Sequence, residues 1–291
     1  MKEKLLVSFS GGETSGYMLY WILNNWQDKY EIKVVFANTG EENEETLLFV
    51  ERCANLFNIE VIWVEGVFHK EHGKGTTHKI VNFETATRSN RLFEEMIQVY
   101  GIPNNSYPHC NRELKLQPIK SYLRSIGWKD YYTAIGIRYD EIDRINSKRK
   151  EHKLLYPLVT EVKTTKTKVN SWWDEQPFRL ELKGYQGNCK TCWKKSEKKL
   201  LKIAFEAPEK FNSFKILEEE YSNFIPESRS LEGKSDNYKI TFFRKNRSAE
   251  WYIENAVDLI VKDDSSETSE QLDLFEESCD IFSMCGDDNN N

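Results

Sequence analysis

No apolar stretch in this 291-residue sequence approaches the length needed to cross a bilayer, and the N-terminus shows no signal-peptide pattern. The six cysteines are too few and too unevenly spread for a disulfide framework. They lie at positions 53, 110, 189, 192, 279 and 285. We therefore expect a cytoplasmic, globular protein with no membrane-bound part, whose cysteines bind a metal or carry out thiol chemistry.

Acidic residues are concentrated at the end of the chain. Residues 262–291 carry ten acidic residues and one basic residue, whereas the rest of the chain carries 40 basic against 37 acidic residues. The slightly cationic body suits anionic ligands, and the tail has the composition of a weakly ordered, solvated segment. Because Cys279 and Cys285 lie among apolar residues of this tail, part of it could instead dock on the body. Both interpretations stay open.

Strand-like and helix-like patterns alternate in the first half of the chain. Buried strands are predicted at residues 5–9, 32–37, 61–64 and 131–137. Helices are predicted at about 15–26, 44–57, 91–100 and 113–126. Residues 66–88 show no clear periodicity and are expected to form a mobile loop. Repeated strand–helix units predict an α/β fold with a doubly wound, mostly parallel sheet, and such sheets bind ligands at the carboxyl ends of their strands.

The stretch SFSGGETSG, residues 8–16, joins the first predicted strand to the first predicted helix. Two adjacent glycines let the chain turn with positive φ and let backbone N–H groups approach a ligand. The first turn of the helix adds unpaired N–H groups and the positive end of the helix dipole. The stretch therefore predicts a phosphate loop, although a glycine-bearing turn without a ligand explains it about equally well. The expected phosphate contacts are Ser8, Ser10, Gly11, Gly12, Glu13, Thr14 and Ser15.

A second strand-to-helix turn carries the sequence Asn38-Thr39-Gly40. In a doubly wound sheet this turn lies beside the first one. There Asn38 could hydrogen-bond an adenine or ribose edge, and Glu45 could orient a sugar hydroxyl. The acid-rich start of the next helix is better explained by the helix dipole. Its acidic residues are at positions 41, 42 and 44.

A third polar turn lies in the stretch GIRYDEIDR, residues 136–144. It begins at Gly136. Arg138 offers a fork of N–H donors suited to a phosphate or a sulfate, and Asp140 can hold the guanidinium in position. The basic run at 144–153 is better explained as a solvated surface, though it could also attract nucleic acid.

The cysteines give a fourth pattern. Cys189 and Cys192 form a Cys-x-x-Cys turn flanked by glycine and lysine, and Cys110 lies far earlier in the chain. Such a turn can bring two thiolates to one metal, and a third thiolate from a distant turn is a common route to zinc or an iron–sulfur cluster. The pair could instead be a redox dithiol. Nearby lysines would lower the thiol pKa in either role.

Taken in order, these stretches resemble the phosphoadenosine phosphosulfate (PAPS) reductase family of the PP-loop adenine nucleotide α-hydrolase-like superfamily. Residues 10–15 are similar to its Ser-Gly-Gly-x-x-Ser loop, residues 38–40 to its Asp-Thr-Gly, and residues 136–144 to its Gly-x-Arg-x-Asp-Glu segment. Residues 110–118 and 184–192 are similar to the segments that carry four cluster cysteines in assimilatory adenylylsulfate reductases. The resemblance spans about residues 5–196.

The resemblance implies a Rossmann-like PP-loop domain with a five-stranded sheet over residues 1–202, which includes the Cys-x-x-Cys segment. A helical C-terminal cap over 203–261 and an acidic, partly disordered tail over 262–291 would follow. It also implies an adenine nucleotide, either ATP or phosphoadenylyl sulfate, bound at the glycine turns. A [4Fe-4S] cluster is the implied metal group, with zinc as the alternative.

The sequence departs from the family pattern at three places. His109-Cys110 replaces a Cys-Cys pair, so the fourth cluster ligand must come from elsewhere, and a tail cysteine is favoured over His109. Asn38 replaces an aspartate, and Glu13 stands where relatives often have lysine or arginine. The expected metal ligands are therefore Cys110, Cys189, Cys192 and Cys285.

The implied reaction is thiol-dependent reduction of (phospho)adenylyl sulfate to sulfite. Cys285 would attack the sulfur, Arg138 would bind the sulfate, and a thioredoxin-like reductant would resolve the intermediate. The alternative is an ATP-dependent, AMP-forming iron–sulfur sulfurtransferase that modifies a nucleobase or nucleic acid, with lysines of 190–202 on the phosphates. A non-catalytic nucleotide-binding module with a structural metal is a third hypothesis. A homodimer is compatible with each.

Overall fold

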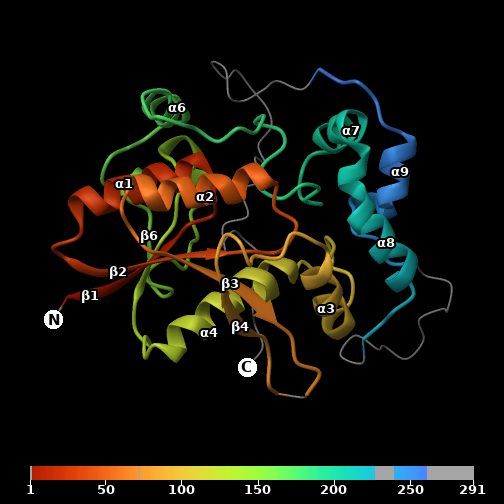
Figure 1. Cartoon of the computed structure of the whole chain (residues 1–291), viewed down its shortest axis with the longest axis horizontal. Coiled ribbons are helices and arrows are strands. Elements are labelled where there is room, and N and C mark those ends of the chain that lie inside the picture. The colour runs from red at the N-terminus through yellow and green to blue at the C-terminus, as the bar shows by residue number, and fades with distance from the viewer. Residues whose placement is uncertain (1, 72, 227–238, 261–291) are drawn as a thin grey trace.

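The structure is a computed structural model that describes residues 2–71, 73–226 and 239–260. A six-stranded sheet with the order β4-β3-β2-β1-β5-β6 forms its centre (Figure 1). The strands are β1 (Glu3–Ser8), β2 (Tyr30–Ala37), β3 (Val61–Val67), β4 (Thr77–Val81), β5 (Tyr132–Ala134) and β6 (Leu154–Leu155). The helices before β5 are α1 (Glu13–Asn25), α2 (Glu44–Leu56), α3 (Arg91–Tyr100), the π-helix η1 (Arg112–Leu116) and α4 (Gln117–Ser125). Those after it are η2 (Tyr139–Arg144), α5 (Pro157–Thr160), α6 (Lys166–Asp174), α7 (Glu197–Glu206), η3 (Pro208–Phe211), α8 (Asn212–Tyr221), η5 (Arg244–Asn246) and α9 (Ala249–Glu254).

The sheet has six strands rather than the five expected. β4 lies within residues 66–88, which the sequence predicted to be a loop, and it pairs antiparallel with β3. As an edge strand it buries only its last residue, Val81, so it lacks the apolar alternation that marks a half-buried strand. It pairs with residues 63–67 of β3, and its His78 Nδ1 lies 2.8 Å from Ser121 Oγ of α4.

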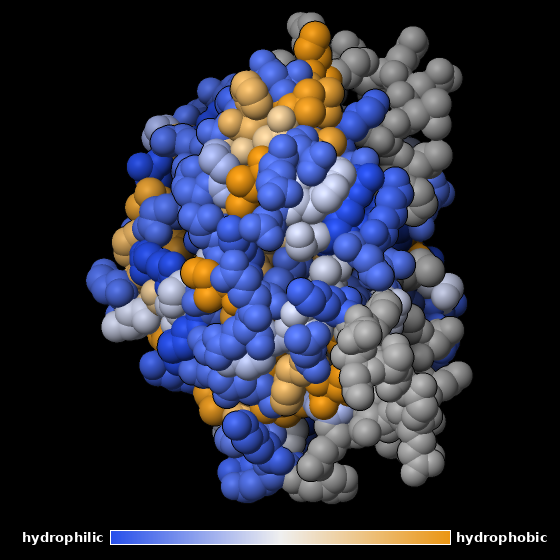
Figure 2. Space-filling view, turned by 90° about the vertical axis from the view of Figure 1, so that its right-hand side faces the viewer, coloured by the Kyte–Doolittle hydropathy of each residue, from blue (hydrophilic) through white to orange (hydrophobic). Residues whose placement is uncertain are grey.

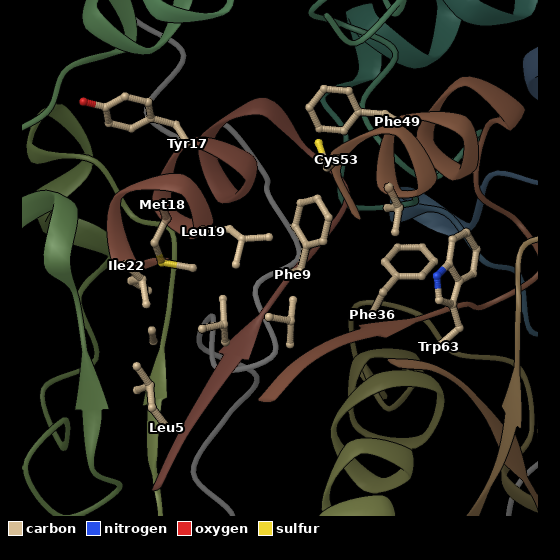
Figure 3. Close-up of a cluster of buried hydrophobic side chains, with 14 of the residues drawn as sticks. Leu5, Phe9, Tyr17, Met18, Leu19, Ile22, Phe36, Phe49, Cys53 and Trp63 are labelled. Atoms are coloured by element: carbon tan, nitrogen blue, oxygen red, sulfur yellow. The ribbon is translucent and has the colours of Figure 1, made fainter. Parts of the chain in front are cut away.

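The other strands are parallel, and both faces of the sheet are covered, as expected for a doubly wound α/β fold. Alternate side chains of β1 point to opposite faces. Leu5 and Val7 pack under α1, α2 and α6, whereas Leu6 packs against α4 on the other side. Figure 3 shows the first of these cores, where α1 and α2 side chains meet Phe9, Phe36 and other side chains of the sheet.

The strand order places the candidate turns at one edge. From β1 the chain adds β2 and β3 on one side, and later adds β5 and β6 on the other. The order therefore reverses between β1 and β5, and in open α/β sheets ligands bind outside the carboxyl ends of the strands at such a point. The turn after β1 carries Gly11 and Gly12, and the turn after β5 carries Gly136 and Arg138.

Helices α7, α8 and α9 lie beside α3 at one end of the sheet (Figure 1). They share one aromatic core with α3, in which Phe214 and Phe242 stack with ring centroids 4.2 Å apart. The outward face at this end is mostly hydrophilic (Figure 2). Residue 202 lies within α7, and the domain boundaries at 202 and 261 stay predictions.

The acidic tail, with Cys279 and Cys285, lies outside the described residues. Within the described part of the chain, no helix combines the length and hydropathy that would let it span a bilayer.

The buried carboxylate of Glu218 links α8 to the backbone at Phe242 and Ala249. It accepts hydrogen bonds from the backbone N–H groups of Phe242, at 2.8 Å, and Ala249, at 2.7 Å. Burial raises the pKa of Glu218 from 4.5 to about 7, while the two N–H donors oppose the shift. A carboxyl group with a raised pKa in the folded state stabilises the fold fully below its unfolded pKa of 4.5. This contribution is lost as the pH rises through about 7.

The unfolding free energy of the wild type should therefore fall between pH 4.5 and pH 8. We expect that fall to be about 2 kcal/mol smaller in Glu218→Gln. Urea denaturation at several pH values measures this slope. Glu41 has a pKa shifted in the same direction, so some slope remains in the variant. A slope identical to that of the wild type would contradict the assignment to Glu218.

Candidate functional site

The first corner, between β1 and α1, has a backbone geometry that can bind an anion. Gly11 has φ +79°, and a Cβ atom there would lie 2.7 Å from Thr46 Cγ2, so only glycine lets this corner pack against α2. The 13-residue helix α1 begins at Glu13, and no side chain of the described residues caps it. Ser15 Oγ donates to Gly12 O at 2.8 Å, and Ser10 Oγ donates to Ser15 Oγ at 3.0 Å. The uncapped N–H groups of this helix start can therefore receive an anion.

Glu13 does not leave a free negative charge at this corner. Arg179, from the segment after α6, donates from Nε and Nη2 to the two carboxylate oxygens of Glu13, both at 3.0 Å. Asp174 also pairs with Arg179, and the Glu13 hydrogen bond is the main cause that raises the pKa of Arg179. Since the fork–fork pair neutralises Glu13, an acidic residue at this position is compatible with an anionic ligand.

The second corner, after β2, is held by a buried polar network. Asn38 is fully buried and donates from Nδ2 to Glu65 Oε1 at 2.7 Å and to Thr87 O at 2.9 Å. An aspartate at this position would face the buried Glu65 carboxylate, which explains the asparagine. The Asn38 amide protons are thus used inside the protein, and a role for Asn38 in adenine or ribose contact stays a prediction.

Thr39 and Gly40 complete this corner. Thr39 donates from its backbone N, at 2.9 Å, and from Oγ1, at 2.8 Å, to the carboxylate of Glu42. Gly40 has φ +82°, and a Cβ atom there would lie 2.4 Å from Ser89 O. Glu45 lies half-buried in the first turn of α2. Burial lowers the pKa of Lys210, and the negative charge of Glu45 partly offsets this shift.

The third corner, after β5, is bound to the start of α1. Arg138 Nη1 donates to Thr14 Oγ1 at 3.2 Å, and Arg138 Nε donates to Asp140 Oδ1 at 3.0 Å. Glu141 also pairs with Arg138, at 3.4 Å. Only 10% of the Arg138 side chain is exposed. Two carboxylates thus offset the charge of Arg138, which lies beside the loop as expected, while Gly136 packs next to Ser15.

The Cys-x-x-Cys segment lies against the first two corners. Asn188 Nδ2 donates to Ser10 O at 2.8 Å, and the backbone N of Asn43 donates to Asn188 O at 2.9 Å. Lys190 N donates to Glu41 O at 2.9 Å, and an isolated β-bridge joins Glu42 to Cys189. The Cys-x-x-Cys segment (residues 188–192, the thiol segment) and the first corner, far apart in the sequence, are therefore neighbours in the structure.

Charged groups surround this segment. Lys195 is buried and donates from Nζ to Cys189 O, and Lys210 Nζ donates to Asn43 Oδ1 at 2.9 Å. Burial raises the pKa of Glu41 to about 7, and the nearby charge of Lys190 opposes the shift. The thiol of Cys189 itself donates to Glu42 Oε1, at 3.8 Å.

Three of the four expected metal ligands, Cys110, Cys189 and Cys192, lie in the described part of the chain. Cys189 and Cys192 belong to one turn, and Cys110 packs against the core that also contains Trp193. Nevertheless, the described residues contain no group of three or more histidine, cysteine or acidic side chains that could hold a metal ion. The fourth expected ligand, Cys285, lies outside these residues. The sulfur ligand set therefore stays a prediction.

A small cleft opens beside the first corner at the carboxyl ends of β1 and β2. It is lined by Ser8, Phe9, Ser10, Val35, Ala37, Lys115 and Ile119. Sequence reasoning did not place Lys115, Arg179 or Asn188 in the site. Lys115 lies on the π-helix η1, a rare form frequent at functional sites, and no local pattern distinguishes the other two.

Comparisons with known proteins give relatives and a structural neighbour. No protein-family profile matches the chain. The uncharacterized nin region protein ORF290 of Escherichia phage lambda is 28% identical over 95% of this chain and 94% of its own length. Two uncharacterized proteins of Methanocaldococcus jannaschii, MJ0066 and MJ0973, are 30% and 28% identical over 51% and 47% of this chain. Each of these two matches spans 26% of the relative's own length. Among solved structures, a phosphoadenylyl-sulfate (PAPS) reductase from Candida auris, in a phosphate complex, aligns with 61% of this chain and 74% of its own. The identity is 14% and the TM-score 0.35.

The pairing of Glu13 with Arg179 predicts how the first corner responds to a change of charge. In Arg179→Ala the Glu13 carboxylate would face the loop without its partner, and we expect ATP to bind about tenfold more weakly. Glu13→Gln in the same background removes that charge and should restore most of the affinity. Isothermal titration calorimetry measures both.

The matched control is Lys183→Ala, which removes a cation of the same segment that pairs with Glu206 instead, at 3.2 Å. Its affinity should equal that of the wild type. Equal losses in the Arg179→Ala and Lys183→Ala variants would contradict a specific role for the Glu13–Arg179 pair.

Proposed function

We propose that the chain is an enzyme that binds an adenine nucleotide at the carboxyl ends of β1, β2 and β5 and carries out sulfur chemistry on it. The observation that carries this proposal is the pair of hydrogen bonds from Asn188 and Asn43, which place the Cys-x-x-Cys segment beside the phosphate loop. An anion-binding corner alone is common in α/β folds. A thiol segment bound to that corner indicates chemistry between sulfur and the bound ligand.

The phosphates lie on the first corner in this proposal. The turn at Gly11 and Gly12 and the uncapped start of α1 supply N–H donors and a positive dipole end. Lys115, which lines the small cleft beside this corner, adds a positive charge.

The reaction proposed first is reduction of (phospho)adenylyl sulfate. A thiolate attacks the sulfate sulfur and forms an S–S bond, the sulfur–oxygen bond to the phosphate breaks, and the nucleotide leaves with its phosphate oxygen as an anion. A second thiolate then attacks the enzyme sulfur of the thiosulfonate, so that sulfite leaves and a disulfide remains. The two thiols are oxidised and the sulfur of the sulfate is reduced. Cys285 is the proposed nucleophile, and a thioredoxin-like protein is the proposed source of the second thiol.

A second reaction has an observation in its favour. Arg138 donates hydrogen bonds to Asp140 and Thr14 and forms an ion pair with Glu141. Fewer of its N–H donors can therefore bind a sulfate than the sequence suggested. The alternative is therefore an ATP-dependent sulfur transfer that releases AMP and diphosphate and modifies a nucleobase or nucleic acid. In either reaction Cys110, Cys189 and Cys192 are proposed ligands of an iron–sulfur cluster or zinc, which would supply redox or sulfur-donor chemistry. Cys285 is the proposed fourth ligand in the transfer reaction, because in the reduction it must stay free to act as the nucleophile. Of these residues, Cys189 and Cys192 lie in one turn.

The test is calorimetric titration of the anaerobically purified full chain with ATP and with phosphoadenylyl sulfate, together with iron, zinc and sulfide analysis. Binding of phosphoadenylyl sulfate followed by thiol-dependent release of sulfite supports the reductase. Binding of ATP followed by release of AMP with a sulfur acceptor supports the transferase. If neither nucleotide binds, the proposal is wrong.

Gly11→Ala is the variant that ties binding to the first corner. Its new methyl group would overlap Thr46 and strain the left-handed turn, so we expect nucleotide affinity to fall at least about thirtyfold. The matched control is Gly127→Ala, where φ is +76° but a Cβ atom would meet nothing within 4 Å. That variant should lose about 1 kcal/mol of stability and no affinity. Undiminished binding by Gly11→Ala would place the nucleotide elsewhere.

A further inference from the structure

Asn188 lies where the phosphate loop and the thiol segment meet. Its side chain is bound to the first corner, since Nδ2 donates to Ser10 O at 2.8 Å. A Cβ atom on Gly12 would lie 3.5 Å from Nδ2 and 3.6 Å from Oδ1 of Asn188, so the amide covers the loop at Gly12. Its backbone carbonyl is bound to the second corner, where it accepts from Asn43 N at 2.9 Å and from Asn43 Nδ2 at 3.3 Å.

The Asn188 amide has unused hydrogen-bonding capacity next to the loop. An asparagine amide group donates two hydrogen bonds, and Ser10 takes one of them. No other acceptor for Nδ2 is present in the described ranges. A phosphate oxygen seated in the loop at Gly12 is a charged acceptor within reach of this group.

The residues after Asn188 are held by the second corner. Cys189 follows directly and forms the isolated bridge with Glu42, and Lys190 N donates to Glu41 O at 2.9 Å. Residues 187–190 form neither a helix nor a regular strand, and these contacts bind their backbone to the second corner. A new hydrogen bond to the Asn188 side chain therefore restricts the motion of Cys189, which is joined to Asn188 by one peptide bond.

We propose that Asn188 is a positioning residue that couples nucleotide binding to the order of the Cys-x-x-Cys segment. A phosphate in the first corner accepts the second amide proton of Asn188 and holds residues 188–190 against both corners. The inference rests on the proposed nucleotide site. Because coupling between two sites is reciprocal, a change that orders this segment also strengthens nucleotide binding by the same factor.

The test is hydrogen–deuterium exchange of the full chain, analysed by mass spectrometry, with and without nucleotide. ATP and phosphoadenylyl sulfate are each used at a concentration that saturates the variant under study. Peptides covering residues 8–16 report on the loop, and peptides covering residues 186–193 report on the thiol segment. In the wild type we expect the nucleotide to slow exchange in both, by about fivefold or more in the thiol segment.

Asn188→Ala should keep the slower exchange at residues 8–16 and lose the nucleotide-dependent change at residues 186–193. Its affinity should fall about tenfold, as for the loss of one hydrogen bond to a charged group. Asn188→Asp keeps the size of the side chain but repels phosphate, so it should bind nucleotide more weakly still. The matched control is Gln186→Ala, whose side chain accepts a hydrogen bond from Lys183 N within its own turn, at 3.0 Å. That variant should behave as the wild type, and thermal unfolding verifies that all three variants are folded.

The outcomes separate the two proposals. If the nucleotide changes neither peptide of the wild type, the proposed function fails and the coupling fails with it. If only residues 8–16 respond, or if Asn188→Ala retains the change at residues 186–193, the nucleotide site stands and the coupling through Asn188 is wrong.

Discussion

Hydrogen bonds between residues 188–190 and two strand-to-helix corners are the contacts on which the candidate site depends. The corners belong to a sheet that is covered on both faces, so their positions are fixed by the core. The thiol segment has no regular secondary structure, and its backbone groups find partners on these corners instead. Asn188 and Ser10 are 178 residues apart in the sequence, yet one hydrogen bond joins them. Without these contacts, the phosphate loop and the cysteines would be two unrelated features of one chain.

Charge imposes a second constraint on this end of the sheet. An anionic ligand requires that nearby carboxylates be neutralised, and three of them are paired with arginine: Glu13 with Arg179, and Asp140 and Glu141 with Arg138. Glu65 accepts hydrogen bonds from Asn38 and Thr87. Glu41 is different, because burial raises its pKa to about 7, so it is largely protonated below neutral pH. These acidic groups near the corners are thus either compensated or partly neutral.

The sequence predicted the parts of the fold that follow from local periodicity. Apolar runs predicted β1, β2 and β3, and apolar residues on one helical face predicted α1 and α2. The structure confirms this alternation. The edge strand β4 was missed because its side chains face solvent and α4 rather than a core, which removes the alternating pattern. The two-residue strand β6 is too short to carry a pattern at all.

The sequence likewise predicted some features of the candidate site and not others. The glycine turns could be found because backbone geometry requires glycine at positions such as Gly11 and Gly40. The partners of Glu13, Asn38 and Ser10 could not be found, since each pair joins residues that only the folded sheet brings together. The place of Asn38 in the turn after β2 suggested contact with an adenine or ribose, and the structure shows its amide bound to Glu65.

A crystal structure of the full chain with a bound adenine nucleotide tests the central claim most directly. The account predicts phosphate oxygens within hydrogen-bonding distance of the backbone at Gly12 and of Asn188 Nδ2, with the thiol segment still bound to Asn43. A nucleotide bound away from the ends of β1 and β2, or a loop at Gly12 that stays covered by Asn188 while the ligand lies elsewhere, would contradict it.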